Sequence, residues 1–276
     1  MKALSKVLLT GAVIAAVKGL DNRLEITRYT VASKKIPKDF DRFKICLFSD
    51  LHNDTTAGLS DAVNAEHPDI ICIPGDMTND KGSFSPFIAL LERLVDIAPV
   101  YMTSGNHDVW RYDYNEFVSC CKKLGASFLE DESVYYNKGN SKIRICGICD
   151  PVARSSGATE KNLLSSLKNI QQEDIYTLLL FHRANLFDFL TNSGFDLILS
   201  GHMHGGQVRI PGIGGFVSPK TNVLSGSGLL FPNYISGEFN KNNTKMIVTR
   251  GIGNPSFIPR LYNRPELCSI TFKAID

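Results

Sequence analysis

Five of the six histidines of the chain lie in short motifs that also contain Asp, Asn and Gly. In chain order the motifs are Asp50-Leu51-His52, Gly75-Asp76, Gly105-Asn106-His107-Asp108, Phe181-His182 and Gly201-His202-Met203-His204. Carboxylate, carboxamide and imidazole groups hold first-row divalent ions, and two such ions a few ångströms apart clamp both oxygens of a phosphoryl displacement. The motifs therefore predict a two-metal hydrolytic centre and a phosphoesterase reaction.

Each motif follows a short apolar run that is rich in Ile, Val, Leu or Phe. The runs are Phe43 to Phe48, Asp69 to Ile73, Pro99 to Thr103, Tyr176 to Phe181 and Phe195 to Leu199. Runs of this kind are typical of buried strands, so the candidate ligands are expected where strands end. In open α/β sheets that edge is where ligands bind. One edge is thus expected to collect residues that are far apart in the sequence.

The spacing within the motifs predicts how the ligands face. Asp50 with His52, and His202 with His204, are two residues apart, which in extended chain places each pair on one face. Glycine precedes Asp76, Asn106 and His202, where the backbone is expected to bend tightly or to approach the ions closely. Two neighbouring cations also need a carboxylate with one oxygen for each, and Asp76 is the candidate bridge.

The remaining pattern predicts an α/β protein with a β-rich C-terminal third. Helical segments are expected at Leu59 to Glu66, Ser85 to Ile97, Tyr112 to Leu124 and Glu160 to Ile170. After His204 the sequence consists mostly of strand-like runs and Gly/Pro turns. With 276 residues and 43% hydrophobic content, the chain is long enough for one large core, and no linker or repeat divides it.

Charge and cysteine content exclude two other classes of protein. Thirty basic and 28 acidic residues give a net charge of +2, without a long basic run, so a nucleic-acid partner is not predicted. Seven cysteines form an odd set, and Cys46, Cys72 and Cys146 lie in apolar runs, which argues against a disulfide framework. For Cys146 and Cys149, whose spacing is CxxC, core packing is the favoured interpretation.

The N-terminus has an apolar run from Val7 to Val17, flanked by Lys2, Lys6 and Lys18. Spanning a bilayer takes roughly 20 apolar residues, so the run is short for a transmembrane helix. It has the length of a signal h-region, but no clear cleavage site follows. Residues 1–22 are predicted to be an anchor or signal-like segment that contacts a membrane surface, with a plain leader as the alternative, and 23–276 the enzyme domain. The side of the membrane is left open.

The ordered motifs resemble those of the calcineurin-like metallophosphoesterases, from about Leu24 to the C-terminus. Finer features resemble a bacterial branch of membrane-associated phosphodiesterases of the YkuE and YaeI type. These features are Ile36-Pro37, Gly205-Gly206-Gln207, Arg250-Gly251-Ile252-Gly253, Arg260 and Arg264-Pro265-Glu266. The resemblance implies a four-layer α-β-β-α sandwich of two mixed sheets, with helices outside and the metals at one rim.

The resemblance also implies a role for each motif residue. One divalent ion would be held by Asp50, His52, Asp76 and His204, and the other by Asp76, Asn106, His182 and His202. His107 would stabilise the transition state or protonate the leaving oxygen, oriented by Asp108. A hydroxide held between the ions would attack phosphorus in line. The ligand set suits two Mn, Fe or Zn ions.

The sequence departs from the family pattern at two positions. The family usually has Pro two residues after the lone histidine, whereas this chain has His182-Arg183-Ala184, and Arg183 is expected to reach toward substrate phosphate. Asn79 stands where the family often has Asp, and we expect it to act only through the ligands that it supports. His67 is expected to have no catalytic role, whereas Asp150 is left open between turn formation and substrate contact.

Three functions are compatible with these motifs. The first is a metal-dependent phosphodiesterase or pyrophosphatase at a membrane, for which the resemblance implies lipid-linked substrates such as UDP-2,3-diacylglucosamine. The second is a soluble phosphomonoesterase or nucleotidase with the same centre. The third, a non-catalytic scaffold, should have lost ligands that this chain keeps. Specificity is expected from the loops Asp150 to Thr159 and Pro211 to Phe231. Their apolar residues, which either contact acyl chains or belong to the core, are Ile213, Phe216, Leu229, Leu230 and Phe231.

Overall fold

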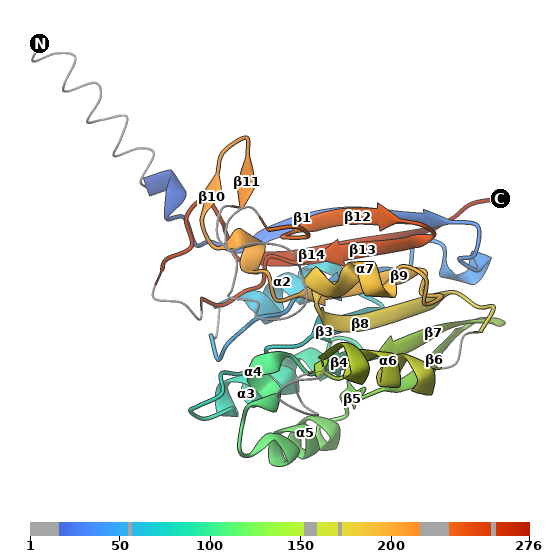
Figure 1. The fold of residues 1–276 in the computed structure, drawn as a ribbon, viewed down its shortest axis with the longest axis horizontal. Coiled ribbons are helices and arrows are strands. Elements are labelled where there is room, and N and C mark those ends of the chain that lie inside the picture. The colour runs from blue at the N-terminus through green and yellow to red at the C-terminus, as the bar shows by residue number, and fades with distance from the viewer. Residues whose placement is uncertain (1–16, 55–56, 152–158, 171–172, 216–231, 255–257) are drawn as a thin grey trace, which may run out of the picture.

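The computed structural model describes residues 17–54, 57–151, 159–170, 173–215, 232–254 and 258–276. They form two six-stranded sheets and a small two-stranded hairpin (Figure 1). The first sheet has the order β1 (Glu25–Ser33), β14 (Glu266–Ala274), β2 (Lys44–Leu47), β3 (Ile70–Pro74), β4 (Val100–Thr103), β5 (Ser127–Phe128). The second has the order β12 (Gly237–Lys241), β13 (Thr244–Val248), β9 (Leu197–Gly201), β8 (Thr177–Arg183), β7 (Ser141–Gly147), β6 (Glu132–Lys138). The hairpin consists of β10 (Arg209–Ile210) and β11 (Gly214–Gly215).

Both sheets are mixed. In the first, β2, β3, β4 and β5 are parallel to one another, and β14 is antiparallel to β2 but parallel to β1. In the second, β7, β8, β9 and β13 are parallel, and the outer strands β6 and β12 are antiparallel to their neighbours. The parallel central strands deliver the segments that follow them to one end of the molecule.

Successive side chains along the strands alternate between the space between the two sheets and the helices outside them. On β2 and β3, Ile45 and Ile70 face a cluster shared with the second sheet, whereas Cys46 and Ile71 pack against helices. Because successive strand side chains point to opposite faces, an entirely apolar strand is buried on both sides. The helices over the first sheet are α2 (Leu59–Glu66), α3 (Ser85–Val95) and α5 (Tyr114–Lys123). Those over the second are α6 (Thr159–Asn169) and α7 (Phe187–Leu190).

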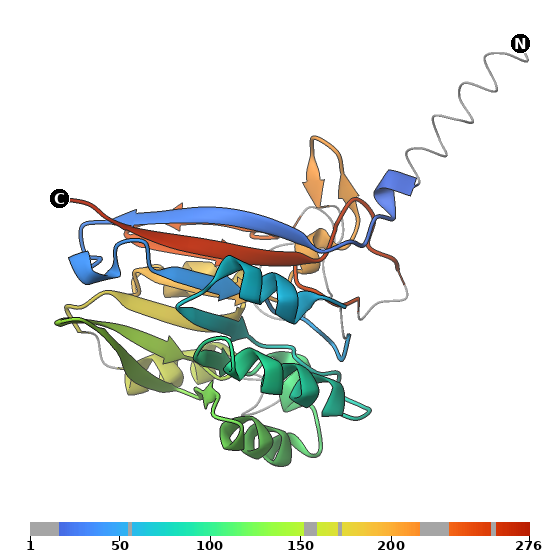
Figure 2. The ribbon, with the colours of Figure 1, turned by 180° about the vertical axis from the view of Figure 1, so that it is seen from behind.

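The predicted α/β fold class and four-layer α-β-β-α sandwich are therefore confirmed, and Figures 1 and 2 show the helices on the outer faces of the two sheets. The predicted helix Leu59 to Glu66 matches α2, and Ser85 to Ile97 extends past α3, which ends at Val95. The C-terminal third forms strands, as expected. All seven cysteines are free.

The N-terminal prediction falls largely outside the described residues. Of the apolar run Val7 to Val17, only Val17 is described, at the start of a helical turn at residues 17–19. Within the described part of the chain, no helix has the length and apolar character needed to cross a membrane.

Candidate metal centre

The structure brings the predicted ligands together at one end of the sandwich. Asp50 and His52 follow β2, and Asp76 follows β3. Asn106 and His107 begin the short helix α4 (Asn106–Val109), which comes after β4. In the second sheet His182 lies near the end of β8, and His202 comes directly after β9. His204 begins the 3-10 helix η4 (His204–Gly206). The expectation that strand ends collect distant residues is met.

The donor atoms form three groups, each within 4.8 Å, and two of them do not include His107. The first of these two is Asp50, His52 and His204, and the second is Asp76, His182 and His202. In the first group, His52 Nε2 lies 3.3 Å from His204 Nε2, and His204 Nε2 lies 3.5 Å from Asp50 Oδ1. In the second group, His182 Nε2 lies 3.1 Å from Asp76 Oδ2 and 3.2 Å from His202 Nδ1. Each group contains three of the four residues in one of the ligand sets that the family resemblance implies.

Asp76 belongs to the second group and also lies close to His52 of the first. Its Oδ2 is 3.1 Å from His182 Nε2 and 3.7 Å from His52 Nε2, and it also belongs to a group with His52 and His107. Its Oδ1 accepts a hydrogen bond of 2.8 Å from the backbone N–H of His107. A carboxylate in this position has an oxygen within reach of ligands from both sheets, which suits a bridge between two cations.

Several buried polar atoms in the centre have no hydrogen-bond partner among the described residues. They are Asn106 Oδ1, His107 Nδ1, His202 Nε2 and His204 Nδ1. Buried polar atoms are nearly always satisfied, so a set without partners needs a physical reason. Carboxylate, carboxamide and imidazole groups that converge on one place without hydrogen-bonding partners for all their atoms are typical ligands of a divalent cation. The residues present therefore fit a metal centre.

Contacts behind the ligands fix which imidazole nitrogen faces the centre. His182 Nδ1 donates to the backbone oxygen of Pro74 at 2.9 Å, which leaves Nε2 toward Asp76. His52 Nδ1 lies 3.1 Å from Asn79 Oδ1, and Asn79 Nδ2 donates to His52 O at 2.9 Å. Such partners orient a ligating ring and fix its tautomer. Asn79 thus acts through His52, as the sequence predicted.

Burial and charge leave the donors largely in the form that binds cations. Burial lowers the pKa of His52 to about 4 and holds the pKa values of His202 and His204 well below the usual range. Burial raises the pKa of the Asp50 carboxyl to about 6. Neutral imidazoles are the form that ligates a metal, so these three rings need no deprotonation at neutral pH.

The exception is the pair formed by Asp76 and His182. Burial disfavours charge on both side chains, but each lies beside the opposite charge of the other. The pKa of Asp76 is lowered well below its usual value, and the pKa of His182 is raised to about 10. A cation bound beside Asp76 would replace the proton on His182.

Comparison with known proteins agrees with this geometry. A sequence model of the calcineurin-like phosphoesterase family matches residues 43–206, more than half of the chain and all seven candidate ligands. The chain belongs to the calcineurin-like phosphoesterase family. It is a hydrolase of the metallophosphoesterase class.

Similar proteins occur in several bacteria. The chain is 27% identical over 264 residues to the uncharacterized metallophosphoesterase YkuE of Bacillus subtilis, covering 92% of this chain and 87% of that protein. It is 27% identical to phosphodiesterase YaeI of Escherichia coli, covering 82% and 80%. The resemblance to the YkuE and YaeI type is thus confirmed. Phosphopantetheinyl hydrolase from Mycobacterium tuberculosis has the same fold, with a TM-score of 0.52 at 13% identity over 78% of this chain and 91% of that one.

The backbone of this phosphoesterase differs from the expected extended chain at the ligand pairs. Asp50, His52, His202 and His204 all have left-handed conformations, with φ of 53°, 51°, 73° and 48°. The prediction that two-residue spacing in extended chain aligns each pair was therefore wrong. Such a residue costs on the order of 1–3 kcal/mol, which the surrounding hydrogen bonds must offset. One of these runs from His202 N to the Asp50 carboxylate at 3.1 Å.

The glycines before the ligands are needed for close approach. A Cβ at Gly105 would overlap Asp76 Oδ1, and a Cβ at Gly201 would overlap Asp50 Oδ2 and Ser49 Oγ. Gly75 has a φ of 96°, a conformation that glycine adopts without steric cost. Both expectations for these glycines, tight bending and close approach, are confirmed.

Asp108 has a different set of contacts from the one expected. Its buried carboxylate accepts hydrogen bonds from the backbone N–H groups of Asp76 at 2.7 Å, Gly105 at 2.9 Å and Thr78 at 3.0 Å. The Thr78 hydroxyl also donates to it at 3.0 Å. The expectation that Asp108 orients the His107 ring is corrected, because the carboxylate instead ties together the two turns that carry Asp76 and Asn106. Sequence spacing missed this role because it depends on a turn from another strand.

His107 occupies the edge of the centre. Its half-buried ring lies 4.8 Å from the His52 ring and 5.0 Å from the Trp110 ring, centroid to centroid. Trp110 is about half exposed, so this side of the centre faces solvent. The position is open to a substrate. His67, in contrast, is an exposed residue at the C-terminal end of α2.

Arg183 also differs from its expected role. Its guanidinium donates to both carboxylate oxygens of Asp150, from Nε at 2.7 Å and from a terminal nitrogen at 3.2 Å. Both side chains are buried, with exposures of 4% and 0%. A guanidinium held in this way does not reach out to substrate phosphate. The pair instead links the end of β8, next to His182, to the segment after β7.

The C-terminal segment supports the ligand turns from behind. Asn263 Nδ2 donates to His204 O at 2.7 Å, and the backbone N–H of Gly253 donates to Asp50 O at 2.7 Å. Buried Arg260 donates from Nε to Gly253 O at 3.0 Å. The sequence drew attention to this region only through its family resemblance, because backbone contacts of this kind leave no local pattern.

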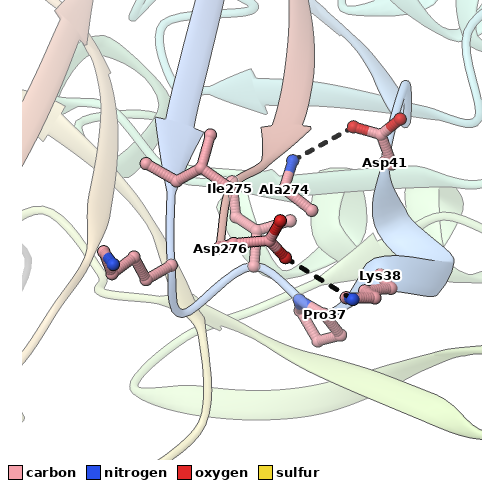
Figure 3. A pocket seen from close by; sticks show the side chains of 8 residues that line it. Pro37, Lys38, Asp41, Ala274, Ile275 and Asp276 are labelled. Carbon is pink, nitrogen blue, oxygen red and sulfur yellow. Dashed lines mark hydrogen bonds and ion pairs between the residues drawn. The ribbon is translucent and has the colours of Figure 1, made fainter.

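A cavity of about 490 Å³ lies at the opposite end of the first sheet, around the ends of β1 and β14. Figure 3 shows Lys38 paired with Asp276, at 3.5 Å, and the N–H of Ala274 directed at Asp41. None of the predicted site residues lines it. The candidate site is therefore located by its donor atoms rather than by this cavity.

Proposed function

We propose that this metallophosphoesterase uses two divalent cations to hydrolyse a phosphodiester or pyrophosphate bond in a membrane-held substrate. One cation would be held by Asp50, His52, Asp76 and His204, and the other by Asp76, Asn106, His182 and His202. The observation that carries the proposal is that Asp76 belongs to one group of buried donors, together with His182 and His202, and lies 3.7 Å from His52 of the other.

Bound there, the cations would polarise the phosphoryl oxygens and activate water. Mn, Fe and Zn suit this donor set. The protein's own contribution is to hold the ligands in place before binding, through Asn79, the Pro74 carbonyl and the hydrogen bonds of Asp108. Preorganised groups need no rearrangement when charge develops in the reaction.

We assign proton transfer to His107. Its ring forms a group with His52 and Asp76 but belongs to neither of the two ligand sets that the family resemblance implies, and it lies on the solvent side beside Trp110. Its backbone N–H donates to Asp76 Oδ1 at 2.8 Å, which fixes the backbone of His107 beside that carboxylate. A histidine so placed protonates the leaving oxygen.

The choice of substrate is supported by two observations outside the centre. The similar Escherichia coli protein is named a phosphodiesterase. The apolar run Val7 to Val17 would keep the enzyme at a bilayer, where lipid-linked phosphoesters reach a high effective concentration. A substrate resembling UDP-2,3-diacylglucosamine, cleaved at its pyrophosphate, fits both. Residues 152–158 and 216–231, in the predicted specificity loops, lie outside the described residues.

The test uses the purified full-length chain, loaded with Mn²⁺ and analysed for metal content. Hydrolysis is measured on bis(p-nitrophenyl) phosphate, on p-nitrophenyl phosphate, and on a diacylated pyrophosphate compared with its soluble head group in detergent micelles. We expect two metals per chain, the diester cleaved faster than the monoester, and the lipid-linked substrate preferred. A faster monoester reaction, with equal rates on the lipid and soluble substrates, would favour a soluble phosphomonoesterase instead.

A further inference from the structure

Three large apolar side chains are exposed at the end of the molecule that carries the metal centre. Val17 and Leu20, in and after the N-terminal turn, are 68% and 50% exposed, and Ile213, at the tip of the hairpin β10–β11, is 69% exposed. In both views the turn and the hairpin lie side by side at this end (Figures 1 and 2). Exposed apolar side chains on neighbouring elements at one end of a protein suit a surface that meets an apolar partner.

The hairpin is fixed to a turn that carries metal ligands. Arg209 donates from its guanidinium to Gly205 O at 2.9 Å, within η4, the helix that begins at His204. Gly215 packs so closely on η4 that a Cβ there would lie 2.7 Å from Gly205 O and 2.9 Å from Gly206 Cα. Whatever the hairpin contacts is therefore held at a fixed position relative to the centre.

The N-terminal turn is joined to the hairpin through Leu261 and Tyr262. The N–H of Tyr262 donates to Gly19 O at 2.6 Å, and the N–H of Arg209 donates to Leu261 O at 2.9 Å. Tyr262 and the hairpin, with Ile210 and Ile213, border a hollow of about 470 Å³. The turn and the hairpin thus form one continuous surface, which we call the rim surface and define as residues 17–20 and 209–215.

Charge and chain direction indicate what covers the rim surface. Lys18 is exposed, and the Arg23 side chain is 83% exposed although Asp21 pairs with it at 2.8 Å. In the sequence, the apolar run Val7 to Val17 leads directly into the turn. Apolar side chains bordered by exposed basic groups suit the interface of an anionic bilayer.

We propose that the rim surface contacts a lipid bilayer, with Ile213 inserted among the lipids, and that this contact positions the metal centre next to the bilayer. This deepens the proposed function, on which it rests, by assigning the element that orients the enzyme on its membrane. An N-terminal anchor alone would only tether the enzyme. A second contact through the hairpin, which is fixed to η4, would also orient the metal centre toward phosphoesters at the bilayer surface.

The experiment places a tryptophan at Ile213 in the full-length chain, as Ile213→Trp, beside the matched control Ile275→Trp. Ile275 is also exposed, at 42%, but it is next to the C-terminus, which Figures 1 and 2 mark at the end of the molecule away from the hairpin. The chain has one native Trp, so the unsubstituted protein supplies the baseline. Emission is recorded with vesicles of phosphatidylcholine and phosphatidylglycerol, with and without brominated acyl chains. We expect a blue shift and quenching by bromine for Ile213→Trp but no change for Ile275→Trp.

A second comparison measures binding strength. Ile213→Ser is expected to lower partitioning into these vesicles by about tenfold, consistent with the loss of one partly buried aliphatic side chain. Ile275→Ser should partition like the unsubstituted chain. If the Ile213→Trp variant sediments with vesicles while its emission stays at the baseline, or if no chain binds vesicles, the proposal is wrong. Hydrolysis of the soluble diester, measured on the same unsubstituted protein, reports separately on the proposed reaction.

Discussion

The buried pair of Arg183 and Asp150 provides a sharp test of how the end of β8 is held. Replacing Arg183 with Met removes a guanidinium that donates twice, at 2.7 Å and 3.2 Å, to a carboxylate with 0% exposure. Breaking a buried pair by removing one partner costs on the order of 3–5 kcal/mol, because the other charge is left buried. In a domain of this size each kcal/mol shifts Tm by about 2–4 °C, so a loss of roughly 6–20 °C is expected.

The assay is denaturant and thermal unfolding of four proteins: the unsubstituted chain, Arg183→Met, Asp150→Leu and the double variant. The double variant should recover most of the loss, since replacing both members with apolar groups removes the unpaired charge. The matched control is Lys241→Met. Lys241 pairs with Asp188 at the same 2.7 Å, but the side chains are 48% and 52% exposed. Exposed pairs contribute about 0–1 kcal/mol. The reasoning would be refuted if the Arg183 and Asp150 single variants were as stable as the Lys241 variant. It would also be refuted if the double variant lost the sum of the two single losses in stability.

Four further predictions concern the centre and the N-terminus. Asp76→Asn should abolish hydrolysis and lose at least one metal by elemental analysis. Asp80→Asn, on the same loop but outside the donor groups, should keep both metals. Two bound metals and normal activity in the Asp76 variant would show that Asp76 is not the bridge. His107→Gln should keep both metals and lower turnover by roughly 10²–10⁴; metal loss would instead place His107 among the ligands. Metal affinity should weaken as the pH is lowered. The raised pKa of His182, about 10, means that the bound metal displaces about one proton from this ring at pH 7. Below pH 6 the raised pKa of Asp50, about 6, adds a second proton, so titration calorimetry at pH 7, 6 and 5 should show a steepening loss and a flat profile would contradict it. Deleting residues 1–20 should move the protein from the membrane to the soluble fraction with its metals retained, and a full-length chain that fractionates as soluble would contradict the anchor.

The sequence by itself determined the strands and the identity of the donors. Runs such as Phe43 to Phe48 are apolar at nearly every position, which is local information and suffices to predict strands buried on both faces. The candidate ligands could be named because most of them come shortly after such a run, as Asp50 and Asp76 do. Helix α2 was predicted at its observed ends because its apolar spacing is local as well.

Only the tertiary structure decided how these pieces meet. The first strand, β1, pairs in parallel with the last, β14, a contact between residues more than 200 positions apart that no periodicity encodes. The left-handed backbone at His202 depends on a hydrogen bond to Asp50 from the other sheet. Asp108 holds the turn of Asp76, and Arg183 is neutralised by Asp150, because folding places those partners beside them. Local patterns determine which side chains are available, whereas hydrogen bonds and charges between distant segments determine what each of them does.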